Sequence, residues 1–163
     1  MRPCFQRASS SCSPPLFEHL QPLAGDQLTT GEVGQRLEIW LKLLVDAIDG
    51  VVDASPSLKE AREDWYETAT TGFGYGINPE LDSFLTDEER LKVVLALCDT
   101  ARQRLIELGD PISPAMLNQI NAGHRDSHFQ REVPAAVFRE TADRFIALIR
   151  DTPFHSANEA GLL

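Results

Sequence analysis

Two pairs of carboxylates have the spacing of a metal site. Asp46 and Asp49 lie three positions apart, and so do Asp64 and Glu67. Residues three apart share one face of a helix, so each pair would present two carboxylates side by side. If the two helices pack antiparallel, the four side chains would converge on an oxygen-rich site, which hard cations such as Mg²⁺ require.

This spacing resembles that of the all-α nucleotide pyrophosphohydrolases, which carry Glu-x-x-Glu on one helix and Glu-x-x-Asp on the next. The resemblance covers residues 46–67, and this chain departs from it with two Asp in the first pair and Asp before Glu in the second. It implies a Mg²⁺-dependent enzyme whose metal orients phosphates and activates water. Its metal ligands would be Asp46, Asp49, Asp64 and Glu67. The alternative interpretation is that these carboxylates form solvated helix faces.

A glycine-rich loop follows the second carboxylate pair. Gly72, Gly74 and Gly76 alternate with Phe73 and Tyr75. Glycine permits backbone conformations closed to other residues, and two aromatic side chains on a loop can anchor a partner. Alternatively, the two rings fold back over the end of the helical domain. The loop lacks the Lys-Ser/Thr of a phosphate-binding loop, and no strand precedes it.

Other chemically active residue types are less well placed. His124 and His128 are four apart, but they follow a glycine in a segment that reads as a loop, with no third metal ligand. Cys98 falls on the apolar side of a predicted helix, which indicates a buried thiol. Cys4 and Cys12 lie near the N-terminus, and we expect no structural disulfide. No Gly-x-Ser-x-Gly motif supports nucleophilic catalysis.

The negative charge is concentrated in the front half of the chain. The formal net charge is −10, and the segment from Glu18 to Glu89 alone carries −12. A field of one sign repels nucleic acid and anionic membranes, and it attracts basic surfaces. On the first long helix, the charged residues are predicted on the wetter faces. They are Glu38, Lys42, Asp46, Asp49 and Asp53.

Apolar residues recur with helical periodicity, and no segment alternates as a strand does. Thr86 and Glu89 have the spacing of a capping box at the start of one helix. Trp40 and Trp65 are predicted to lie in the core. We expect helices from Thr30 to Val52, Pro56 to Ala69, Thr86 to Leu108, Ser113 to Ile120 and Val137 to Ile149, with one or two turns between Glu80 and Leu85.

These elements predict an all-α, single-domain antiparallel bundle of five to six helices. We expect residues 1–14 to be a disordered leader, residues 15–151 the helical domain and residues 152–163 a flexible tail. No apolar run is long enough to span a bilayer, and the N-terminus lacks the apolar segment of a secretory signal. The sequence therefore predicts a cytoplasmic protein.

The functional hypothesis is a small acidic protein that docks onto a basic protein and neutralises it, as immunity proteins, antitoxins and other inhibitors do. Toxins that act on nucleic acid carry basic clefts, which an acidic helical face would plug with fast, steered association. No nucleic acid, membrane, cofactor or catalytic residue enters this hypothesis. The predicted contact residues are Glu60, Glu63, Asp64, Glu67, Phe73, Tyr75, Glu80 and Asp82. The alternatives are the Mg²⁺ enzyme and a helical adaptor or regulatory domain.

Overall fold

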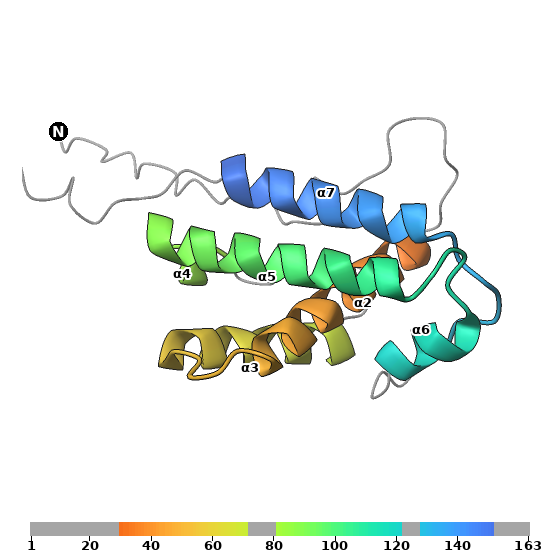
Figure 1. Cartoon of the computed structure of the whole chain (residues 1–163), viewed down its shortest axis with the longest axis horizontal. Coiled ribbons are helices and arrows are strands. Elements are labelled where there is room, and N and C mark those ends of the chain that lie inside the picture. The colour runs from red at the N-terminus through yellow and green to blue at the C-terminus, as the bar shows by residue number, and fades with distance from the viewer. Residues whose placement is uncertain (1–29, 72–80, 122–127, 152–163) are drawn as a thin grey trace, which may run out of the picture.

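The computed structural model describes residues 30–71, 81–121 and 128–151, and every regular element in these ranges is a helix (Figure 1). The all-α class is therefore confirmed, whereas the antiparallel order of the bundle stays a prediction. The predicted leader and tail lie outside the described residues. The helices are α2 (Thr30–Asp49), α3 (Pro56–Thr71), α4 (Leu81–Phe84), α5 (Glu88–Glu107), α6 (Pro114–Ile120) and α7 (Ala135–Asp151).

Helix α2 is the centre of the fold. It contacts α3, α5, α6 and α7, and every residue from Leu37 to Val45 is buried. Its sequence explains this position. Leu37 and Leu41 lie on one apolar stripe, and Ile39 and Leu43 place further apolar side chains outside that stripe. A helix that is apolar on nearly all sides is stable only when other helices surround it. None of the helices in the described ranges is both long and apolar enough to cross a membrane.

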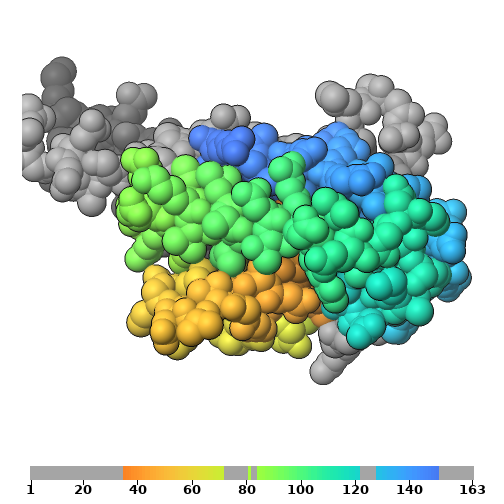
Figure 2. Space-filling view, in the orientation of Figure 1, coloured from red at the N-terminus to blue at the C-terminus, as the bar shows by residue number. Residues whose placement is uncertain are grey.

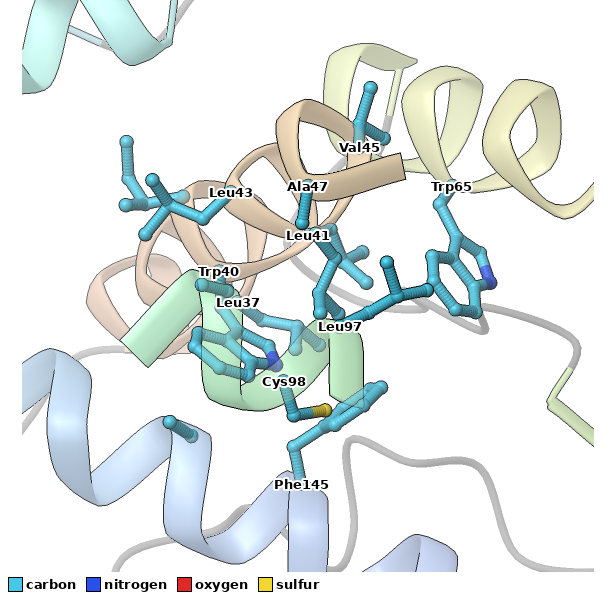
Figure 3. Close-up of a cluster of buried hydrophobic side chains, with 14 of the residues drawn as sticks. Leu37, Trp40, Leu41, Leu43, Val45, Ala47, Trp65, Leu97, Cys98 and Phe145 are labelled. Atoms are coloured by element: carbon cyan, nitrogen blue, oxygen red, sulfur yellow. The ribbon is translucent and has the colours of Figure 1, made fainter. Parts of the chain in front are cut away.

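Two aromatic pairs join the helices in the core, as predicted for both tryptophans. The ring of Trp40 meets Phe145 of α7 edge-on at 6.1 Å, and Trp65 of α3 meets Phe84 of α4 at the same distance. Cys98 lies near Trp40 and Phe145 in the view of Figure 3 and is fully buried. Burial raises the pKa of its thiol to about 12, so Cys98 packs as a small apolar side chain.

The ends of α2 and α5 differ from the sequence-based expectation. Helix α2 ends at Asp49 rather than Val52, because Gly50 weakens its last turn, and Val52 is 85% exposed. The N-cap of α5 is Asp87, whose carboxylate accepts a hydrogen bond from the Arg90 N–H at 2.9 Å. The capping box predicted at Thr86 is therefore wrong by one residue. A carboxylate at this position also faces the positive end of the helix dipole.

The two neighbouring residues Leu105 and Ile106 offer a matched test of the core. Leu105 is fully buried, whereas Ile106 is 61% exposed on the same turn of α5. We expect Leu105→Ala to lower the free energy of unfolding by about 2–5 kcal/mol, since it leaves a cavity. Ile106→Ala should cost less than about 0.5 kcal/mol. Urea unfolding followed by circular dichroism measures both, and equal losses would contradict the packing described.

The cap of α5 gives a second prediction. Asp87→Ala should lower the melting temperature more than Thr86→Ala does, because only Asp87 satisfies the N–H of Arg90. The pKa of Asp87 lies below its ordinary value of 3.8, and this hydrogen bond is the largest cause of the shift. The stabilisation is therefore complete above about pH 4 and is lost as the pH falls through the lowered pKa. Thermal melts of both variants and the parent chain between neutral and acidic pH measure the difference, which should shrink in acid.

Candidate functional site

Four of the predicted contact residues are acidic residues of α3, and the helix exposes all four to solvent. Its sequence fixes this orientation, because apolar side chains recur at helical spacing and turn one stripe toward α2. The buried residues of that stripe are Leu58, Ala61, Trp65 and Ala69. Glu60, Glu63, Asp64 and Glu67 lie on the remaining faces, and all four are exposed. Figure 1 shows α3 along the lower edge of the molecule.

The acidic residues of α3 differ from those of α5 and α7 in their ion pairs. Most carboxylates of α5 and α7 pair with an arginine or lysine. These pairs are Asp87–Arg90, Glu88–Lys92, Glu89–Lys92, Glu107–Arg104, Glu140–Arg144 and Asp143–Arg102. On α3, Glu60, Asp64 and Glu67 form no ion pair within the described ranges. We refer to these three residues as the α3 carboxylates.

Arg62, the arginine of α3, is bound within the fold. Its guanidinium donates two hydrogen bonds of 3.0 Å each to the carboxylate of Asp49 on α2, and a third of 3.1 Å to Glu63. This bidentate geometry is the strongest arrangement of an arginine–carboxylate pair, and it raises the pKa of Arg62 further above its ordinary value. Arg62 is therefore already paired and does not neutralise the α3 carboxylates.

The remaining predicted contact residues lie near the end of α3 in the sequence. Phe73, Tyr75 and Glu80 fall outside the described residues, and so does His124. Asp82 belongs to α4, between the buried residues Leu81 and Phe84. Within the described residues, most of the predicted contact residues therefore lie on α3, and Asp82 lies on α4.

The four carboxylates of the predicted Mg²⁺ site are not gathered in one place. Asp49 is bound to Arg62, and Asp64 lies two positions after Arg62, which is about 200° around the helix. Within residues 30–71, 81–121 and 128–151, no three Asp, Glu, His or Cys side chains are grouped as metal ligands. The resemblance to the nucleotide pyrophosphohydrolases stays a prediction without support from this geometry.

Two charged residues of α2 are buried, contrary to the expectation that they lie on wetter faces, whereas Asp46 and Asp49 are exposed as expected. Glu38 is 3% and Lys42 is 5% exposed, and Asp46 follows them one turn later. Helix α3 covers this side of α2, and Lys42 Nζ lies 5.6 Å from the centre of the Tyr66 ring. The sequence does contain the relevant signal, because acid, base and acid follow one another at i, i+4 spacing. We refer to Glu38, Lys42 and Asp46 as the charged ladder.

Burial and neighbouring charges shift the ionisation of the charged ladder. Burial lowers the pKa of Lys42, while Asp46 and Glu38 oppose that effect. Partial burial raises the pKa of Asp46, and repulsion from Asp49 raises it further, against the attraction of Arg104, Lys42 and Arg62. The pKa of Asp46 is therefore raised mainly because partial burial disfavours its charged carboxylate.

An apolar groove begins beside Asp46. It lies between the end of α2, the start of α3 and α5, and it has a volume of about 360 Å³. Figure 2 shows α2 and the start of α3, coloured from orange to gold, directly below α5 in green. Val51 and Val93 line the groove while remaining 40% and 42% exposed. The other lining residues are Asp46, Ala47, Gly50, Leu58, Ala96, Leu97 and Thr100.

The charged ladder generates a prediction about Asp46. Asp49→Asn removes the repulsion that raises the pKa of Asp46, and it releases Arg62, which attracts the Asp46 carboxylate. Both effects act in the same direction, so the pKa of Asp46 should fall. Carbon-detected NMR titration of the Asp46 carboxyl measures the change. Glu63→Gln is the control, since Glu63 also binds Arg62 but does not shift Asp46, and an unchanged pKa in Asp49→Asn would refute the electrostatic account.

Comparison with known proteins identifies no relative of this chain. No protein-family model matches this chain, and no curated protein or solved structure matches it significantly. The proposal for its function therefore depends on the residues and geometry described above.

Proposed function

We propose that this chain is an acidic cytoplasmic protein that docks onto a basic protein partner and neutralises it, as an immunity protein, antitoxin or inhibitor does. The observation that carries the proposal is the difference in pairing between the helices. Most carboxylates of α5 and α7 are matched by bases, whereas the α3 carboxylates Glu60, Asp64 and Glu67 are exposed and form no ion pair in the described ranges.

The α3 carboxylates create a local negative potential, which basic groups on a partner would complement. Such complementarity accelerates encounter and orients the complex more than it adds affinity. Helix α3 is held to α2 by a buried stripe that includes Leu58 and Trp65, so the α3 carboxylates have fixed relative positions. The proposal takes neighbouring long helices as antiparallel, which the opposite colour gradients of α5 and α7 in Figure 1 support.

Affinity requires apolar contact in addition to charge. Tyr66 is 39% exposed on α3, and its ring is already flanked by Lys42 and by Arg62 at 5.3 Å. Exposed aromatic residues of this kind are frequent centres of protein interfaces. The proposed contact surface also includes the predicted residues Phe73, Tyr75, Glu80 and Asp82.

The test compares two variants that carry the same change of net charge. The first reverses the α3 carboxylates with Glu60→Lys, Asp64→Lys and Glu67→Lys. The matched control reverses three exposed acidic residues elsewhere with Asp99→Lys, Glu107→Lys and Glu140→Lys. Each full-length variant and the parent chain are immobilised, exposed to lysate of the source organism and eluted with salt, and mass spectrometry identifies the retained proteins. We expect a basic protein on the parent and control columns that is missing from the α3 variant.

Association rates measured at several salt concentrations then test the mechanism on the purified partner. A rate that falls by about tenfold or more as salt is raised supports electrostatic steering. Identical retention on all three columns would overturn the choice of α3. A partner whose association is insensitive to salt would favour the helical adaptor instead.

A further inference from the structure

A pocket lies at the other end of α2, away from the apolar groove. It is bounded by the first half of α2, the segment 128–134 and the start of α7, which meet at the right of Figure 1. Its volume is about 830 Å³, which is within the range of small-molecule binding sites. The lining residues are Gln35, Arg36, His128, Phe129, Gln130, Arg131, Glu132, Val133, Pro134, Val137 and Phe138. We refer to it as the Arg36 pocket.

The wall formed by residues 128–134 is fixed at both ends. Asn118 of α6 holds the backbone of Phe129 from both sides, since its amide nitrogen donates to the Phe129 carbonyl at 2.9 Å and its oxygen accepts from the Phe129 N–H at 2.8 Å. Val133 forms a two-hydrogen-bond bridge with Ile112. Asp110 then accepts from the Ala135 N–H at 2.9 Å. These contacts lie within the fold, and they hold this wall of the pocket in place.

The chemistry of the Arg36 pocket is apolar with a cationic side. Phe138 is fully buried, and Phe129 and Val137 are partly buried, so the lining includes two aromatic rings. Arg36 is half-buried and has no ion pair within the described ranges. A guanidinium that loses part of its hydration without gaining an anionic partner is unfavourable, because no protein group replaces the lost hydrogen bonds to water.

The charge of this pocket is opposite to that of the chain. Among the described residues, the lining includes the guanidinium groups of Arg36 and Arg131 and the carboxylate of Glu132, in a protein whose net charge is −10. His128 lies exposed at the edge of the pocket. The negative field of the rest of the molecule would repel an anion, so a ligand must bind by local contacts rather than by long-range attraction.

We propose that the Arg36 pocket binds a small organic anion, namely a carboxylate or phosphate attached to an apolar or aromatic body. The guanidinium of Arg36 binds the anionic group through paired N–H donors, for which its planar geometry is suited. The partly exposed ring of Phe129 packs against the apolar body. This site is independent of the proposed docking surface on α3, and it requires no partner protein.

The experiment uses the full chain and two fluorescent probes with the same ring system. 1-Anilinonaphthalene-8-sulfonate carries one negative charge, and N-phenyl-1-naphthylamine lacks it. Arg36→Gln should weaken binding of the charged probe by about tenfold or more, which corresponds to one charge-assisted contact, and leave the neutral probe within about twofold. Arg150→Gln, at the opposite end of α7, is the control and should change neither affinity.

A second variant locates the site. Val137→Trp fills the pocket and should weaken both probes, and addition of the charged probe to the parent chain should shift the amide NMR signals of Phe129, Val133 and Val137. Circular dichroism and melting temperature establish that each variant remains folded. The proposal is overturned if the charged probe does not bind, if Arg36→Gln binds it as the parent does, or if the NMR shifts lie away from these residues.

Discussion

The burial of α2 on nearly every side is the constraint on which the other features depend. Four helices must contact it to remove Leu37 through Val45 from water, and their positions follow from the side of α2 that each covers. Removing that much apolar surface from water is the main favourable contribution to folding. The aromatic contacts of Trp40 with Phe145 and of Trp65 with Phe84 extend the same core into α7 and α4.

This central position also determines the electrostatics of the molecule. Because α3 packs on the charged side of α2, Glu38 and Lys42 are buried and Asp49 obtains Arg62 as a partner. Arg62 of α3 is used in this contact, and the α3 carboxylates form no ion pair within the described ranges. The negative surface of the proposed docking site is thus a result of how the core packs, in addition to the composition of the front half of the chain.

The two halves of α2 support different kinds of site. Its C-terminal half forms the base of the apolar groove next to Asp46 and the acidic side of α3. Its N-terminal half contributes Arg36 to a pocket whose other wall is fixed by Asn118 and Asp110. The fold therefore places the proposed docking surface and the proposed anion pocket at separate ends of α2, in a chain with a net charge of −10.

The sequence by itself determined the helical class, the core positions of Trp40 and Trp65, the buried thiol of Cys98 and the exposure of the acidic residues of α3. These features depend on periodicity along one helix, which local spacing reports directly. Only the tertiary structure decided that Glu38 and Lys42 are buried, that Asp49 binds Arg62, and that Arg36 lines a pocket. Each of these outcomes depends on which helices become neighbours, and contacts between residues far apart in the chain leave no periodic signal in the sequence.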